Sequence, residues 1–201
     1  MVTLIVLLSA AILIADSRLP SSLCAYVAFT AATLWLGYDP RAGAAHLALF
    51  ACVGALKIVA GPLAISLLAR KYAVPRNLAP SITAPWRIVV AACVAFAAYE
   101  IARMPAFANL ARADAVLYAI FASICTIVLH RNLLAHAIGL LALGSAMSLA
   151  GAVFAPGLPG SMELAGTFDA VIAALVAVLL ARALVTYDPR LDVASLRELR
   201  G

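Results

Sequence analysis

Long apolar runs separated by short polar breaks dominate this 201-residue sequence. A bilayer core of about 30 Å needs about 20 helical residues, because lipid offers the backbone no hydrogen-bond partner and a helix satisfies its own. Seven runs meet or approach that length: residues 2–15, 20–38, 46–69, 87–103, 114–130, 132–155 and 164–186. The sequence therefore predicts an all-α, polytopic bundle of about seven transmembrane helices.

Composition excludes a soluble domain. Hydrophobic residues make up 66% of the chain and charged residues 11%, against about 45–50% and about 25% in soluble proteins. The net charge of +5 does not indicate a nucleic-acid binder, because the basic residues are scattered over many short segments. The first apolar run has no Lys or Arg before it and no small-x-small site after it, so we interpret it as a span rather than a signal peptide.

The distribution of Lys and Arg over alternate loops predicts the orientation, since basic residues near helix ends resist translocation. Ten fall on one side: Arg18, Arg70, Lys71, Arg76, Arg87, Arg131, Arg182, Arg190, Arg197 and Arg200. Three fall on the other: Arg41, Arg103 and Arg112. The ten-residue side is expected to be cytoplasmic, which places the N-terminus outside and the C-terminus inside.

No catalytic or metal site is predicted in this chain. The four cysteines lie singly within apolar runs, without the paired spacing of zinc or iron–sulfur ligands, and we interpret them as small packing residues. The sequence has no hydrolase elbow, phosphate-binding loop or cofactor fingerprint. The chain is therefore not expected to be an enzyme by itself.

Lys57 is the polar residue whose position is most costly. It lies near the centre of the third apolar run, where insertion of a lysine costs about 2.5–3.5 kcal/mol. Either it pairs structurally, by snorkelling or by contact with a neighbouring subunit, or it exchanges protons. Pro62, five residues later, frees a backbone carbonyl and predicts an irregular helix at this level.

Three further ionisable residues are candidates for a proton path. Asp169 lies about one turn into the seventh run and is either a proton carrier or an outer-interface carboxylate. Glu100 is one turn from Arg103, so an interfacial ion pair is its alternative role. His136, one turn after Arg131, either relays protons or packs with a hydrogen bond.

Small residues in the sixth run share one helix face. Gly144, Ser148 and Gly151 recur at i, i+4 and i+7. Such a face lets another helix approach closely. We therefore expect it to be a helix-packing surface.

The C-terminal third resembles the K subunit of bacterial complex I. Residues 130–134 (HRNLL) followed by 138–140 (IGL) look like that family's signature, and residues 191–201 resemble its closing segment. Over its whole length the chain is more similar to component E of hydrogenase-4 and formate hydrogenlyase-type complexes. The residues that match that family are Lys57 with Pro62 and Arg70, then Arg131, Asn132 and Gly139, and finally residues 169–170 and 178–182.

The resemblance implies a four-helix N-terminal membrane extension over residues 1–113 and a three-helix K-like module with a cytoplasmic tail over 114–201. It implies a membrane-arm subunit of an energy-converting complex in a bacterial inner membrane, contributing to proton translocation and to assembly. The expected partners are antiporter-like and quinone-module-like membrane subunits and a hydrogenase-like peripheral arm. Nickel–iron and iron–sulfur centres are expected in those partners and no cofactor in this subunit.

The chain departs from both families at their membrane glutamates. The K-subunit glutamates fall on Leu141 and near Ala173, and the component E glutamate falls on Gly144. Asp169, one turn before Ala173, is the carboxylate that could replace them in part. The sequence leaves three hypotheses open: a proton path through Lys57 and Asp169, a purely structural adaptor, or a subunit of a cation/proton antiporter-like complex. An independent small-solute carrier ranks last, because the sequence lacks paired broken helices in two matching halves.

Overall fold

The computed structural model describes residues 2–38, 44–71, 78, 80–107 and 110–154, together with residues 172, 175, 176, 179 and 180. Within these residues the chain forms α-helices and one π-helix and no strand. The elements are α1 (Val2–Ala15), α2 (Leu19–Gly37), α3 (Ala44–Ala55), the π-helix η1 (Leu56–Ala60), α4 (Gly61–Lys71), α5 (Ala84–Ala102), α6 (Ala113–Leu129) and α7 (Leu133–Phe154).

Six of the seven predicted apolar runs coincide with these helical segments to within three residues, the third run being α3, η1 and α4 in succession. Four segments are long and apolar enough to cross a membrane: Leu19–Gly37, Phe50–Lys71, Ala84–Ala102 and Leu133–Phe154. The helices α1 and α6 are apolar but shorter. The seventh run, with Asp169, and the C-terminal tail lie outside the described residues apart from five single positions.

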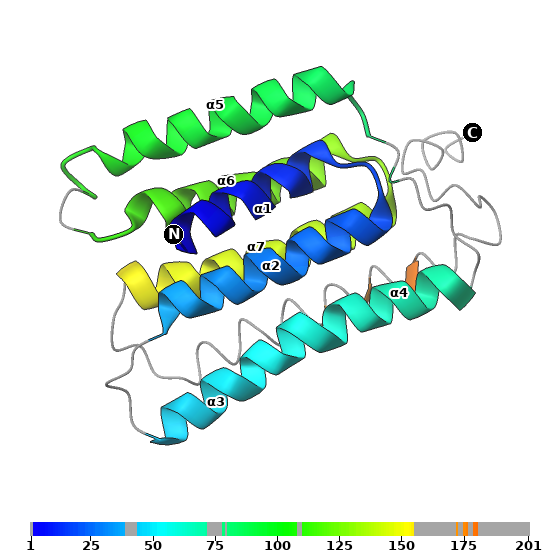
Figure 1. The fold of residues 1–201 in the computed structure, drawn as a ribbon, viewed down its shortest axis with the longest axis horizontal. Helices are drawn as coiled ribbons and strands as arrows, with labels where there is room; N and C mark the ends of the chain where they lie inside the picture. The colour runs from blue at the N-terminus through cyan, green and yellow to red at the C-terminus, as the bar shows by residue number, and fades with distance from the viewer. Residues whose placement is uncertain are drawn as a thin grey trace.

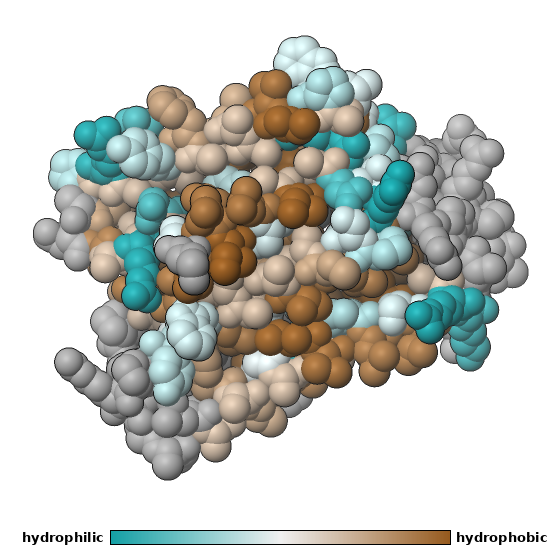
Figure 2. All heavy atoms as spheres, viewed as in Figure 1, coloured by the Kyte–Doolittle hydropathy of each residue, from teal (hydrophilic) through white to brown (hydrophobic). Residues whose placement is uncertain are grey.

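The helices run roughly along one common direction (Figure 1). The helix α1 packs against α2, α5 and α6, and α7 packs against α2 and α6. The helix α5 lies on one side of this group, and the continuous segment α3–η1–α4 lies on the other (Figure 1). In the view of Figure 2 hydrophobic residues fill the middle of the molecule and hydrophilic ones gather towards the two ends, as a membrane-crossing bundle requires.

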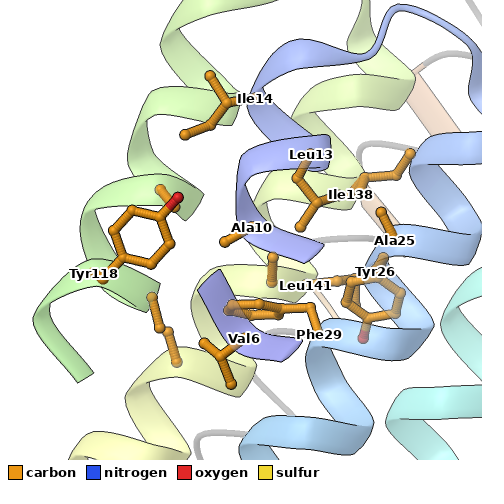
Figure 3. Close-up of a cluster of buried hydrophobic side chains, with 14 of the residues drawn as sticks. Val6, Ala10, Leu13, Ile14, Ala25, Tyr26, Phe29, Tyr118, Ile138 and Leu141 are labelled. Atoms are coloured by element: carbon orange, nitrogen blue, oxygen red, sulfur yellow. The ribbon is translucent and has the colours of Figure 1, made fainter. Parts of the chain in front are cut away.

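A single hydrophobic core joins the two predicted regions of the chain. Side chains of α1, including Val6, Ala10 and Leu13, meet Tyr118 of α6 and Ile138 of α7 (Figure 3). The boundary predicted between residues 113 and 114 falls at the first residue of α6. The core crosses it, because α1 and α2 pack on α6 and α7.

The hairpin of α6 and α7 depends on two residues of the RNLL-like motif region. A Cβ at Gly139 would lie 2.5 Å from Ile127 Cγ1, with backbone atoms of Ile127 and Ser123 at 3.3 and 3.4 Å, so only glycine fits this crossing. Asn132, fully buried, accepts the backbone N–H of Leu134 through its Oδ1 at 2.8 Å and so caps the first turn of α7.

Three connections meet at one end of the bundle. The N–H of Leu78 donates to Ser17 O at 2.7 Å, and the N–H of Ser81 donates to Leu129 O at 2.8 Å. The buried His130 ring lies 3.1 Å from Asp16 O through Nε2 and 3.0 Å from Thr126 O through Nδ1. The α1–α2 turn, the segment before α5 and the α6–α7 turn are therefore joined to one another.

Basic residues gather at that same end. Arg18, Arg70, Lys71, Arg87 and Arg131 all stand at helix ends or turns there. Arg112, at the opposite end, donates from Nη1 to Leu36 O at 2.6 Å and so ties the start of α6 to the end of α2. The described helices thus place Arg112 at the opposite end of the bundle from these five basic residues, as the charge count predicted.

The interpretation of the cysteines as packing residues was wrong for three of them. Cys24, Cys52 and Cys93 are exposed, and only Cys125 is half-buried. A thiol is apolar enough to face lipid as readily as a core, so an apolar run does not reveal which side of the helix is buried.

Candidate functional site

Lys57 lies in a π-helix in the middle of a long helical segment. Residues 44–71 form α3, η1 and α4 without a break, and Lys57 stands about 20 Å from either end at about 1.5 Å per residue. Pro62 has no N–H to donate to the carbonyl of Ile58, and its ring crowds that carbonyl. The wider π-turn Leu56–Ala60 stands immediately before Gly61 and Pro62, which gives the predicted irregularity its form.

The segment contacts the rest of the bundle along one narrow seam. Val53, Lys57 and Ile65 are at most 2% exposed, and the half-buried Gly61 lies between Lys57 and Ile65 at the same four-residue spacing. A four-residue repeat overshoots a 3.6-residue turn by about 40° a step, and the wider π-turn brings the series back to one face. A Cβ at Gly61 would lie 2.8 Å from Leu141 Cδ1, so glycine permits the close approach to α7.

The Lys57 side chain is buried, at 2% exposure, and is bonded to α7. Its Nζ donates to Ser148 Oγ at 2.5 Å and to Gly144 O at 3.4 Å. Ser148 in turn donates to Gly144 O at 3.1 Å. Gly144 and Ser148, predicted to form a helix-packing face, therefore bind the lysine of this same chain. Gly151, the third residue of that face, has nothing within 4 Å of a Cβ built on it among the described residues.

A cluster of buried hydroxyl groups adjoins the lysine. Tyr26 donates from its hydroxyl to Lys57 O at 3.1 Å. The same hydroxyl interacts with those of Thr30 and Ser145, and Thr30 Oγ1 and Ser145 Oγ are 3.2 Å apart. Thr33 follows on α2 and donates to Thr30 O at 2.9 Å. Hydroxyls both donate and accept hydrogen bonds, so these groups form a polar strip inside an apolar bundle.

A small cavity connects the lysine with this strip. Its volume is about 10 Å³, and its polar lining is Thr33, Lys57, Ser145 and Ser148. Leu34, Gly37, Phe50, Leu149 and Ala152 complete the wall. These apolar residues extend from the level of the lysine towards the end of the bundle where α2 ends.

Neither His136 nor Glu100, the other candidates among the described residues, comes together with Lys57. His136 stands in the first turn of α7, about 18 Å along that helix from Ser148, and its Nδ1 lies 2.9 Å from Asn132 O. Glu100 is exposed at the end of α5, on the far side of the bundle from η1 (Figure 1). Arg103 lies 5.3 Å from the centroid of the Tyr99 ring rather than against the Glu100 carboxylate. Asp169 lies outside the described residues.

Sequence reasoning missed the hydroxyl groups of α2. Ser22, Tyr26, Thr30 and Thr33 are at most 2% exposed and follow one another at i, i+4, i+8 and i+11, which is one face of a helix. Ser22 Oγ has no hydrogen-bond partner among the described residues. The signal in the sequence was the helical spacing of these hydroxyl residues within an apolar run. The length and the charge of a run do not reveal such spacing.

This arrangement can hold and exchange a proton, because the Lys57 ammonium is bonded to a hydroxyl group. An ammonium bonded to a hydroxyl, with further hydroxyls in contact, is the kind of array along which protons move within a membrane. Within the described residues, no three His, Cys, Asp or Glu side chains gather into a metal site.

Comparison with known proteins assigns no family to this chain. No protein-family model matches the chain, and no curated protein and no solved structure matches it. The functional argument therefore depends on the site itself.

Proposed function

We propose that this chain is a membrane-arm subunit of a complex I-related, energy-converting complex of the hydrogenase-4 or formate hydrogenlyase kind, and that Lys57 exchanges protons in it. The observation that carries the proposal is the buried Nζ of Lys57, bonded to Ser148 and Gly144 inside an apolar bundle. A lysine at this depth is costly to insert. Its burial within a π-helix is typical of a functional site.

The arrangement of the helices supports a seven-span subunit. The α1–α2 turn, the segment before α5 and the α6–α7 turn lie together at the basic end. If each helical segment crosses the membrane once, these three connections fall on the same side of it. We propose that residues 164–186 supply the seventh span, that the basic end faces the cytoplasm, and that the N-terminus lies outside. The membrane is then the bacterial inner membrane, with the positive end inward.

The family resemblance supports the kind of complex. Asn132 and Gly139, which match the families, hold the α6–α7 hairpin together. The Lys57 ammonium lies against the carbonyl of Gly144, the position at which the component E pattern has a glutamate. In this chain the lysine therefore faces a backbone carbonyl at the position where the family resemblance expects a carboxylate. Nickel–iron and iron–sulfur chemistry then belongs to the partner subunits.

Purification from native membranes tests the membership of such a complex. A tagged full-length chain, extracted in mild detergent, is expected to bring with it antiporter-like and quinone-module-like membrane proteins and a hydrogenase-like peripheral arm that contains nickel and iron. Recovery of the chain with antiporter-like proteins alone, and with no redox subunit, would contradict the proposal.

A structural adaptor is the second candidate, favoured by the apolar face that α5 turns outward. Trp86, Ile88 and Phe96 are each more than 60% exposed there. On that reading Asp169→Asn leaves both assembly and proton movement intact. On the proton-path reading Asp169→Asn lowers proton movement while the complex stays assembled.

A further inference from the structure

The cavity beside Lys57 has the size and the lining of a water site. Its volume of about 10 Å³ matches the space that one water molecule needs, and a buried water needs two to four polar partners. Three hydroxyl oxygens line it, from Thr33, Ser145 and Ser148. An empty cavity of this polarity would leave hydrogen-bonding capacity unused inside an apolar bundle.

The bonding of the three hydroxyls leaves each of them able to accept. Thr33 donates to Thr30 O and Ser148 donates to Gly144 O. Ser145 donates to Leu141 O at 3.2 Å. A hydroxyl has one hydrogen and two lone pairs, so each oxygen keeps at least one site for a hydrogen of water. A water molecule in the cavity thus joins Ser148, which holds the lysine, to Ser145, which lies in the hydroxyl strip.

Among the described residues, the packing around the cavity leaves one direction open. Towards the basic end the strip is closed, because Tyr26, Thr30 and Leu141 are at most 2% exposed. Towards the other end the wall contains Gly37, the last residue of α2, and Ala152, which is exposed. A Cβ at Gly37 would lie 3.5 Å from Ala152 Cβ and 3.9 Å from Leu149 Cδ1. The smallness of Gly37 and Ala152 keeps this side unfilled.

We infer that the cavity binds a water molecule and that protons exchange between Lys57 and the solvent through it, by way of the end of the bundle marked by Gly37 and Ala152. The inference rests on the proposed proton role of Lys57 and adds its direction of access. Protons pass from the ammonium to the water along hydrogen bonds, and no covalent bond between heavy atoms changes.

The chain contains only two lysines, Lys57 and Lys71, which makes the test specific. The full-length chain, labelled with ¹⁵N-lysine and placed in lipid nanodiscs, gives two Nζ signals in solid-state NMR, which Lys71→Arg assigns. We expect a water cross-peak to the Lys57 Nζ. We expect its loss in Gly37→Val and in Ala152→Leu, which fill the open side from two different helices.

The matched control is Gly151→Val, one residue from Ala152 and facing open space, which should keep the cross-peak. Ala152→Leu changes an exposed position, so it keeps the test valid where Gly37→Val does not fold. A Lys57 signal without a water cross-peak, or a cross-peak that survives both filling variants, overturns the inference and leaves the proton role of Lys57 standing. Proton movement that survives loss of Lys57 overturns the proposed function instead, with the water site intact.

Discussion

The group formed by α1, α2, α6 and α7 and the segment that carries Lys57 are packed by different means. Half of the most apolar stretch of α2 and of α7 is buried, against 24% of the stretch Phe50–Lys71. The four-helix group closes around aliphatic, alanine and aromatic side chains (Figure 3). The Lys57 segment is attached along one narrow seam, in which Val53 and Ile65 flank the Gly61 contact and the bond between the Lys57 ammonium and the Ser148 hydroxyl. The dense group thus holds α7 in position, while the looser packing of the Lys57 segment leaves the small cavity beside Lys57.

Gly139→Ala should give the largest loss of stability, because it tests the dense group. The added methyl meets Ile127 Cγ1 and also backbone atoms of Ile127 and Ser123, and the backbone cannot move aside cheaply. Overpacking of this kind costs about 1–3 kcal/mol. Chemical denaturation in detergent micelles measures it. The matched Gly151→Ala, facing open space, should instead gain about 0.5–1 kcal/mol from its helix preference, and equal effects at both glycines would contradict the packing described.

Asn132→Ala should give the next largest loss. The substitution removes the side-chain oxygen that accepts the N–H of Leu134 and leaves that group buried. Loss of such a cap costs about 0.5–2 kcal/mol. Asn132→Ser keeps a capping oxygen and should recover part of the denaturation midpoint. A serine variant no more stable than the alanine variant would show that capping is not the role of this residue.

Gly61→Ala should cost less than Gly139→Ala, although both contacts are short. The atom that the new methyl would meet is the far end of the flexible Leu141 side chain, at 2.8 Å. Rotation of that side chain relieves the contact for about 1 kcal/mol. The Nζ signal of Lys57 should shift in this variant, because the Leu141 side chain moves beside the seam, whereas Gly139→Ala acts on a different pair of helices. A larger loss at Gly61 than at Gly139 would reverse the comparison.

The smallest effect concerns pH at the α1–α2 turn. Burial acts to raise the pKa of Asp16. The hydrogen bonds from Ser21 and from the backbone of Arg18 and Ser17, together with the positive charge of Arg18, outweigh burial and lower the pKa below 3.8. A carboxyl whose pKa is lowered in the folded protein stabilises the fold at pH values above its pKa in the unfolded chain. That stabilisation is lost as the pH falls through its pKa in the folded protein. As the pH is lowered below about 3.8, the temperature of the thermal midpoint should therefore fall more in the parent protein than in Asp16→Asn.

The sequence predicted the all-helical architecture and the helix irregularity near Lys57. Apolar length located six helices, since lipid leaves the backbone no other structure, and Lys57 with Pro62 indicated the irregular helix. The role of Ser148 was missed, because a small polar residue at helical spacing fits a packing face and a lysine-binding face equally well. The hydroxyls of α2 were missed because their partners, Lys57 and Ser145, lie far away in the sequence. Such pairings depend on which helices become neighbours, and periodicity within one helix does not contain that information.

Proton movement coupled to electron transfer, measured in membrane vesicles with Lys57→Met, tests the central claim most directly. Methionine keeps the length of the side chain and removes the exchangeable proton. Lys71→Met, the same change at an exposed lysine at the end of α4, is the control. The account predicts that the Lys57→Met complex assembles and transfers electrons but moves no protons, while the control behaves as the parent. Unchanged proton movement in Lys57→Met would contradict it.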